Sequence, residues 1–173
     1  QRQDNADDIR DDREDYYDPR NSLLDQVLQR RRGIPITLSV IGIEVARRRG
    51  VALEGIGMPG HFLIGDRSTG RFFDAFDRGR GIGPDGARDL FHSLHGVEQP
   101  FESVYLGATS ATMIVVRVLN NLRGAHLRRG DRGGLAAALR LQAALPGSAL
   151  PARRDLAGVL AADGRLLDAA AVH

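Results

Sequence analysis

Cysteine and lysine are both absent from this chain of 173 residues. Without cysteine there is no disulfide, no thiolate metal site and no thiol nucleophile. All 24 side chains counted as lysine or arginine are arginines, so the chain cannot supply the amine of an isopeptide cross-link. Arginine-only usage is typical of a GC-rich genome. The composition therefore excludes every reaction that needs a thiol or a lysine amine of this chain.

Long apolar runs and export signals are also lacking. No stretch approaches the roughly 18–20 apolar residues that span a bilayer, and the most apolar segment, residues 34–46, is interrupted by polar side chains. No basic segment followed by an apolar one begins the chain, so we expect a cytoplasmic protein without membrane association. The chain starts at Gln1 rather than Met, and a helical pattern continues up to His173. We therefore expect a fragment or a processed chain.

The net charge of +2 is unevenly distributed along the chain. Residues 1–20 hold eight acids and four arginines, a local charge of −4, whereas residues 117–173 hold nine arginines and four acids, a local charge of +5. Basic segments bind nucleic acid through its phosphates, but these arginines lack the interleaved aromatic residues of such surfaces. A solvated helix face is the favoured interpretation, and nucleic acid is not the expected partner.

Apolar spacing and turn signals predict three regions: an acidic arm at residues 1–20, a mixed α+β domain at 21–106 and a helical region at 107–173. In the domain we expect two helices, three strands, a glycine-rich loop and a short helix, at residues 22–32, 35–49, 53–57, 61–65, 71–76, 77–86 and 85–94. In the helical region we expect helices at residues 110–129, 132–145, 150–162 and 165–172.

The first two predicted helices differ in their expected environment. The first carries an apolar stripe formed by Leu23, Leu24, Val27 and Leu28. Asn21 or Ser22 is its expected N-cap, and Gly33 is its expected end. The second helix begins at Pro35, where the missing N–H is no loss. Because its apolar residues go nearly all the way round, we expect it to be central and buried.

The four C-terminal helices form two successive pairs. Their offset of roughly 35–40 residues resembles that of tetratricopeptide-type repeats. Such pairs present concave surfaces suited to peptides. Two repeats alone are marginal, so we expect them to lean on the first domain or on further repeats.

A histidine and an aspartate are expected on neighbouring strands, beside the start of the buried helix. His61 follows Pro59-Gly60 on the second predicted strand, and Asp74 lies on the third. A carboxylate bonded to an imidazole fixes its tautomer, and a helix start favours a nucleophile through the positive end of its dipole. The three parts of a triad scaffold are therefore laid out in order.

These motifs resemble the transglutaminase-like fold, in which a helix-start Gly-x-Cys supplies the thiol and later strands supply His and Asp. His61 falls on the family's His and Asp74 on its Asp. Gly33-Ile34-Pro35 falls where Gly-x-Cys would be, so Pro35 occupies the nucleophile position. This substitution is similar to the SirB-type branch, whose members pair such a domain with C-terminal tetratricopeptide-like helices. The match covers roughly residues 12–170.

The resemblance implies a papain-like core, in which a buried central helix packs on a small antiparallel sheet, followed by an all-α tetratricopeptide-like region. It also implies a regulatory role, because the branch has been named for transcriptional regulation. One departure is Asp74-Ala75-Phe76-Asp77, where the branch has Asp-Pro-Phe followed by Asn-Gly-Gly. We therefore expect the loop after Asp74 to be shaped differently.

Proline has no side-chain nucleophile, so Pro35 excludes acyl transfer through a thioester at this position. The hydroxyls of Thr37 and Ser39 are alternative nucleophiles, but the favoured interpretation is that they hydrogen-bond the helix backbone. His61 and Asp74 can still form a general base for water, worth roughly 10²–10⁴-fold in rate. The equally weighted alternative is a structural pair, in which Asp74 satisfies the ring N–H of His61.

Other polar residues are candidates for a binding role. Glu44 is expected to pair with an arginine such as Arg31 or to face His61, and a buried unpaired Glu would have a raised pKa. Tyr16 and Tyr17 either fold over the cleft as a lid or cap the first helix.

No cofactor is expected. His92 and His95 have metal-like spacing but no partner carboxylate at a matching interval, so no metal site is expected either.

Two functions compete. The first is a non-catalytic protein that binds a protein or peptide partner and acts in regulation. The alternative is a cysteine-independent hydrolase or transferase that uses His61 and Asp74 as a general base. The oligomeric state is left open.

Overall fold

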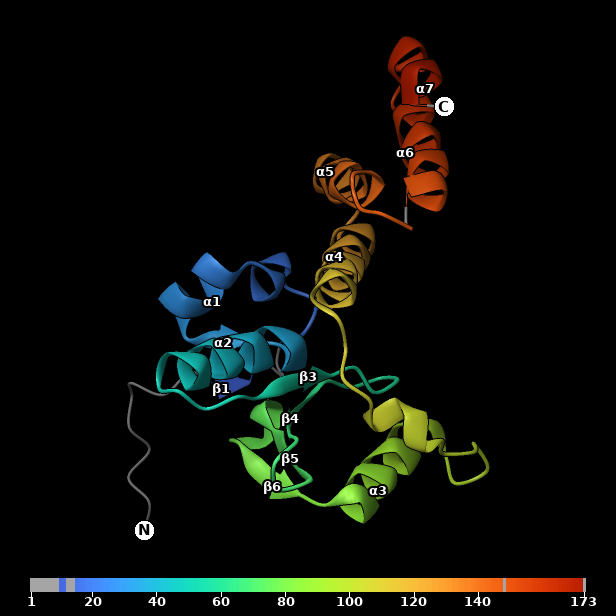
Figure 1. Ribbon diagram of the computed structural model, residues 1–173. Coiled ribbons are helices and arrows are strands. Elements are labelled where there is room, and N and C mark those ends of the chain that lie inside the picture. Colours follow the sequence, from blue (N-terminus) through green and yellow to red (C-terminus); the bar gives the residue numbers. More distant parts are fainter. Residues whose placement is uncertain (1–9, 12–14, 148, 173) are drawn as a thin grey trace.

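The chain, here as a computed structural model, is described at residues 10–11, 15–147 and 149–172. A small α+β part comes first and a series of helices follows it (Figure 1). The helices are α1 (Leu24–Arg30), α2 (Pro35–Arg48), α3 (Pro84–His95), α4 (Ala111–Arg128), α5 (Arg132–Ala143), α6 (Ala149–Ala162) and α7 (Leu166–Val172). The strands are β1 (Arg10–Asp11), β2 (Arg32–Gly33), β3 (Glu54–Ile56), β4 (Leu63–Asp66), β5 (Arg71–Asp74) and β6 (Arg80–Ile82). Short 3-10 helices are η1 (Pro19–Ser22), η2 (Ala75–Asp77) and η3 (Ser103–Leu106).

The acidic arm predicted for residues 1–20 falls largely outside the described residues. Within it, β1 pairs in parallel with β2. Residues 15–18 form a turn in which the Asp18 amide donates to the Asp15 carbonyl, 3.0 Å away. This turn leads directly into η1, so the end of the arm is folded against the domain.

The main sheet is antiparallel, with strands in the order β3-β4-β5-β6. One row of paired residues crosses it from Gly55 through Ile64 and Phe73 to Gly81. The expectation of a loop throughout residues 77–86 is wrong, because β6 adds an edge strand there. The backbone hydrogen bonds to β5 form without any alternation of apolar and polar residues in β6. The glycine-rich sequence of β6 therefore did not indicate a strand.

His61 lies just before a strand rather than within one. Gly60 has a φ of +74°, and the His61 amide donates to the Met58 carbonyl at 3.1 Å, so a tight turn continues through residue 61. β4 therefore begins at Leu63, two residues later than predicted. Because β4 and β5 are antiparallel, the start of β4 still lies beside the end of β5, where Asp74 is the last residue.

α1 is shorter and more exposed than expected. The predicted caps Asn21 and Ser22 lie in η1, which is capped instead by the Asp18 carboxylate accepting from the Arg20 amide at 2.9 Å. Val27 is buried, but its partners in the expected stripe are at least 40% exposed: Leu23, Leu24 and Leu28. α1 thus packs through one side chain rather than through a stripe.

Arg31, not Gly33, ends α1. Arg31 adopts the left-handed conformation, with a φ of 56°. Gly33 lies in β2, where a Cβ would stand 2.9 Å from both the Leu38 and Thr37 side chains. The glycine is therefore needed for the close approach of β2 to α2 and not for a helix end.

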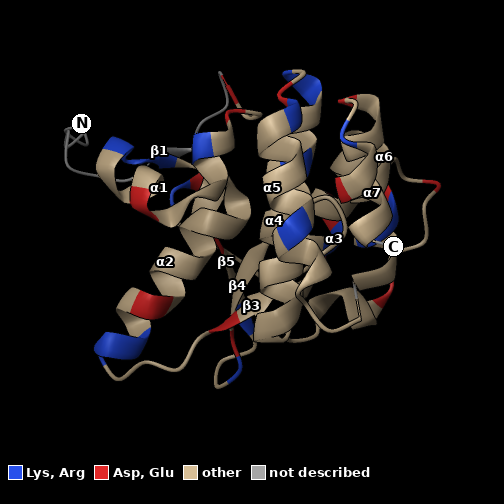
Figure 2. Cartoon of the chain, turned by 90° about the horizontal axis from the view of Figure 1, so that it is seen from above, with Lys and Arg blue, Asp and Glu red and all other residues tan. Residues whose placement is uncertain are grey.

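α2 is buried only at its beginning. Its first five residues, Pro35–Ser39, are buried, whereas Val45 is 55% exposed. The expectation of a helix buried along its length is therefore wrong. In Figure 2 the acidic band on α2 lies one turn before the basic end of the helix, on a part that faces solvent. The apolar composition of α2 does not show that the neighbouring elements cover only the first half of this helix.

The expected two helix pairs are present as α4/α5 and α6/α7. The Ser110 hydroxyl caps α4 by accepting from the Met113 amide at 3.3 Å. α4 packs on α2 and on α5, and α6 and α7 lie farthest from the sheet (Figure 1). α5, α6 and α7 share a core of their own, built around Leu135, Leu139, Leu156 and Leu160. No helix in the described part of the chain combines the length and apolar character needed to cross a bilayer.

Candidate functional site

His61 and Asp74 form the expected pair. His61 Nε2 lies 3.0 Å from Asp74 Oδ1, and both side chains are at most 9% exposed. Asp74 Oδ1 also accepts from the Phe76 amide at 2.9 Å. Burial raises the pKa of Asp74, but the hydrogen bond and charge of His61 and the hydrogen bonds from the backbone of Phe76 and Asp77 together outweigh it, so the pKa lies below its usual value. Asp74 is therefore an anion at neutral pH.

The second ring nitrogen of His61, Nδ1, has no hydrogen-bond partner among the described residues. The imidazole lies edge-on to Phe76, with 6.3 Å between ring centroids, and Phe76 in turn lies edge-on to Tyr16 at 6.2 Å. These rings hold the imidazole from one side. The arrangement leaves one nitrogen fixed by Asp74 and one available to a ligand.

A pocket of about 390 Å³ opens next to His61. Its lining comes from four separate parts of the chain and consists of Tyr16, Pro35, Ile36, Gly60, His61, Phe62, Arg117, Asn120 and Asn121. Below it, Ile34, Ile36 and Phe62 pack with Ile114 and Val118 of α4. One apolar cluster thus joins three segments that lie far apart in the sequence. These are the start of α2, the turn that precedes β4, and the helix α4.

Pro35 lines this pocket together with His61, as expected for the position of the absent nucleophile. The nearby hydroxyls do not replace it. Thr37 Oγ1 donates to the Asn21 carbonyl at 2.8 Å and accepts from the Ile34 amide at 3.1 Å, which confirms its predicted role at the helix start. Ser39 is fully buried and its hydroxyl has no hydrogen-bond partner among the described residues, so the prediction of a backbone bond is wrong for Ser39. Thr37 already satisfies the helix start.

Arg117 of α4 is a site residue that sequence reasoning missed. Its Nη1 donates to the Gly57 carbonyl at 2.7 Å, and its Nη2 to the carbonyls of Met58 and His61 at 3.0 and 2.9 Å. Its guanidinium also lies over the Phe62 ring, 5.5 Å from the centroid. Arg117 thus holds the turn that carries His61. No sequence signal marks Arg117, because it is one of nine arginines in the basic C-terminal part.

Burial lowers the pKa of Arg117, and the nearby Tyr16 raises it by a smaller amount. Tyr16, for which a lid over the cleft and a cap of the first helix were both expected, lines the pocket. Burial also raises the pKa of Tyr16. Tyr17 does not line the pocket; Arg128 lies 3.9 Å from its ring centroid, and Arg129 forms an ion pair of 2.6 Å with Asp15. The end of α4 therefore fixes the segment that carries Tyr16.

Two further candidates lie away from the pocket. Glu44 pairs with Arg47 and Arg48 of the next turn, at 2.7 and 2.8 Å, rather than with Arg31. These two arginines lower the pKa of Glu44 to about 2, so it is a surface ion-pair residue that does not face His61. Arg31 is exposed at the end of α1 and is not part of the pocket lining.

The histidines of α3 serve a structural contact. His95 Nε2 lies 3.1 Å from the Pro59 carbonyl, so α3 packs on the turn before His61. In the ranges that the structure describes, no three His, Asp or Glu side chains gather in a way that would hold a metal ion.

The fold and site define a mixed α+β protein with a His–Asp pair and a proline at the nucleophile position. Residues 6–120 match the family model of the transglutaminase-like superfamily. The match covers more than half of the chain, so the chain belongs to this superfamily. It ends within α4 and includes Arg117 and Asn120.

Curated relatives are similar over part of their length. A UPF0162 protein of Xylella fastidiosa is 40% identical over 131 residues, covering 72% of this chain and 47% of that protein. A UPF0162 protein of Pseudomonas aeruginosa is 35% identical over 113 residues, covering 65% and 42%. Human F-box only protein 21 is 43% identical over 67 residues, covering 38% and 11%. The chain thus spans about half the length of the bacterial relatives it matches. No solved structure matches it.

Proposed function

We propose that this chain is a non-catalytic member of the superfamily, of the SirB type, that binds a protein or peptide partner and acts in regulation. The observation that carries the proposal is the pocket in which Pro35 and His61 meet. A cavity is kept where a catalytic site would lie, but no side chain in its lining is a nucleophile suited to acyl transfer. Such a pocket suits recognition better than turnover.

The nearest hydroxyls support this proposal. The Thr37 hydroxyl is engaged with backbone groups, and that of Ser39 is fully buried. Neither residue lines the pocket. A covalent intermediate on this chain would require one of them to leave its place in the first turns of α2.

The helical region supports a protein or peptide as the ligand. A groove of about 530 Å³ lies between α4, α5 and α6, with Arg123, Arg132 and Arg154 in its lining. We interpret α4–α7 as tetratricopeptide-like pairs, whose concave faces bind peptides. α4 lines both the groove and the pocket, so one partner can contact both. The cytoplasmic location and the domain boundary near residue 106 stay predictions from the sequence.

Affinity capture with matched variants tests the proposal. Wild type, His61→Ala and His92→Ala are immobilised, and each retained partner is identified and its Kd measured. His92 is the control, because it lies on α3 outside the pocket lining. We expect a partner that His92→Ala retains and His61→Ala loses.

His61→Ala also leaves the buried Asp74 without its partner, which destabilises the fold. Asn121→Arg is therefore the second variant, because it adds bulk at the pocket wall and leaves the buried pair intact. Equal affinity of the partner for wild type and Asn121→Arg would contradict binding at the pocket.

A second candidate function is hydrolysis with His61 as general base. The specific observation in its favour is the 3.0 Å bond to Asp74, together with an Nδ1 that has no hydrogen-bond partner among the described residues on a histidine that lines the pocket. Such a base accelerates attack of water by roughly 10²–10⁴-fold. With 4-nitrophenyl acetate as an activated substrate, this function predicts a drop of about 10²-fold in His61→Ala. The same rate in both proteins would exclude it.

A further inference from the structure

We infer that the pocket recognises a carboxylate of its ligand, and that Arg117 supplies the charge that binds it. The inference rests on the proposed function, since it names the chemistry of the ligand at the same pocket. It begins from the pocket lining, in which Arg117 is the charged residue and no Asp or Glu occurs. Asp74 is engaged by His61 and does not line the pocket.

Arg117 has no carboxylate partner among the described residues. A guanidinium has five N–H donors, and Arg117 donates to three backbone carbonyls. The Nε–H and one Nη1–H are therefore left without a partner among the described residues, on a side chain that lines the pocket. Burial lowers the pKa of Arg117, and the interaction that raises it comes from Tyr16, which is a phenol and not a carboxylate. The cation is therefore desolvated without a carboxylate beside it among the described residues. A carboxylate in the pocket would form a charge-assisted hydrogen bond with it.

Asn120 adds a second donor to the same wall. Its Oδ1 accepts from Gln142 Nε2 at 2.7 Å, and Gln142 is buried. Because the side-chain oxygen of Asn120 already accepts from Gln142 of α5, its NH₂ group is the part that can donate to a ligand. Arg117 and Asn120 are three residues apart on α4, and thus on the same face of the helix. One face of α4 therefore presents a cation and an amide donor to the pocket.

The size and charge of the pocket favour a carboxylate over larger anions. About 390 Å³ is near the lower end of ligand pockets, which fits one side chain or one chain end of a peptide. The single cation of the lining matches a monoanion. A phosphate at neutral pH carries close to two negative charges and would leave one unbalanced. The carboxylate is therefore that of an Asp or Glu side chain or of a peptide C-terminus.

Nuclear magnetic resonance of the ¹⁵N-labelled full chain tests the inference with small probes. The probes are N-acetyl-aspartate N-methylamide, which carries a side-chain carboxylate, N-acetyl-alanine, which carries a terminal one, and N-acetyl-alaninamide, which is neutral. We expect the two carboxylates to shift the Arg117 Nε–H and Asn120 NH₂ signals and the neutral probe not to. The tighter of the two acids identifies the source of the carboxylate.

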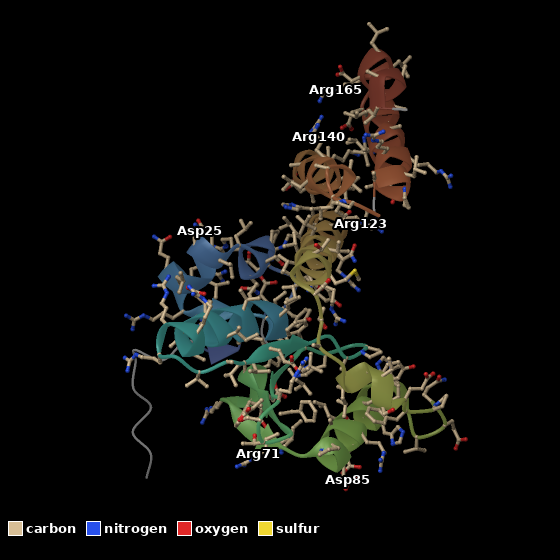
Figure 3. The ribbon with its side chains drawn as sticks, viewed as in Figure 1. Asp25, Arg71, Asp85, Arg123, Arg140 and Arg165 are labelled. Atoms are coloured by element: carbon tan, nitrogen blue, oxygen red, sulfur yellow. The ribbon has the colours of Figure 1, made fainter. Side chains whose placement is uncertain are left out.

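Four variants separate charge from structure. Arg117→Gln is expected to weaken carboxylate binding at least about ten-fold, whereas Arg117→Lys keeps the charge and is expected to bind better than Arg117→Gln. Asn120→Asp keeps the oxygen that accepts from Gln142 but adds a negative charge, so about ten-fold weaker binding is expected. Arg88→Gln is the control, since Arg88 pairs with Asp85 on α3 at 3.0 Å and lines neither the pocket nor the groove (Asp85 is labelled in Figure 3).

Specific outcomes would overturn the inference. If the neutral probe shifts the same signals with equal affinity, the pocket binds ligands but not through charge, so the proposed function would stand and the carboxylate would not. Tighter binding of inorganic phosphate would make the ligand class wrong. Equal loss in Arg117→Lys and Arg117→Gln, with Asn120→Asp unchanged, would reduce Arg117 to a structural clamp.

Discussion

Three side chains set the chemistry of the pocket: Pro35, His61 and Arg117. Pro35 suits the first turn of α2, where its missing N–H costs nothing, but it provides no nucleophile. His61 keeps one nitrogen on Asp74 and one without a partner among the described residues. Arg117 adds a desolvated cation. The combination fits the proposed role in recognition of a ligand.

Pro35→Cys tests whether residue 35 truly faces His61. A thiol at a helix start beside a histidine has a pKa below its usual value of about 8.5. Because the chain has no other cysteine, alkylation by iodoacetamide reports on this thiol alone. We expect its rate to reach half-maximum at least about one pH unit below that of Ala111→Cys.

Ala111→Cys is the matched control, because Ala111 is the exposed first residue of α4. Both thiols then feel a helix dipole. Residue 35 is buried, and burial raises a thiol pKa, so a lower midpoint at residue 35 reports on His61. Superimposable pH profiles would show that residue 35 and His61 do not interact.

Asp18 provides a pH-dependent part of the stability. Hydrogen bonds from Arg20 lower the pKa of this buried carboxyl below its ordinary value of 3.8. A lowered folded-state pKa means that the contribution is present above about pH 3.8 and is lost as the pH falls through the folded pKa. We expect Asp18→Asn to reduce the free energy of unfolding by about 2 kcal/mol at pH 6 and by less below pH 3.8.

Urea unfolding at both pH values measures this difference. Asp25→Asn is the control, because Asp25 is exposed on α1, and its effect is expected to be much smaller than that of Asp18→Asn. A difference between wild type and Asp18→Asn that does not change with pH would disprove the role of the ion pair.

At the scale of elements, α4 connects the pocket and the groove. Arg117 and Asn120, near its middle, line the pocket, and Arg123 and His126, nearer its end, line the groove. Its last residues fix the segment of Tyr16 through the contacts of Arg128 and Arg129. α4 thus belongs to both the α+β part and the helical region.

The helix α1 buries one apolar side chain, Val27, which gives a clear prediction. Val27 is fully buried, so Val27→Ala removes two methyl groups from the core and leaves a cavity. We expect it to lower the free energy of unfolding by about 2 kcal/mol. Leu28→Ala removes a larger side chain that is 54% exposed, and its effect is expected within about 0.5 kcal/mol. Chemical denaturation measures both, and the reverse order would contradict the packing of α1.

At the scale of the whole molecule, the core is divided. Leu135, Leu139, Leu156 and Leu160 form a cluster made of α5, α6 and α7 alone, whereas Ile56 and Leu63 belong to a cluster under the sheet. Charged residues of both signs are spread over both parts (Figure 2). The helices at the end of the chain therefore have a stability that is partly their own.

Leu160→Ala tests this division. Leu160 is 2% exposed, so the substitution is expected to cost about 2–5 kcal/mol of local stability. Hydrogen exchange should then accelerate in α5–α7, while the amides of β3–β5 keep their wild-type protection. Faster exchange in the sheet by the same factor would mean that the molecule unfolds as one unit.

Some features could be predicted because their signals are local. Gly130-Asp131 and Asp163-Gly164 divide the C-terminal helices, whose bounds fall within two residues of those expected. The pairing of His61 with Asp74 followed from two neighbouring strands. The strand β6 was missed, because an edge strand is made by its partner rather than by its own pattern.

The sequence by itself determined the absence of a thiol, the order of Pro35, His61 and Asp74, and the succession of helices, since each depends on residue identity or short-range periodicity. Only the tertiary structure decided the half-burial of α2, the isolation of Ser39 and the place of Arg117. The carbonyls that Arg117 binds lie 56 to 60 residues before it. The packing of the elements decides which faces meet across so many residues of sequence. The periodicity within one element does not contain this information.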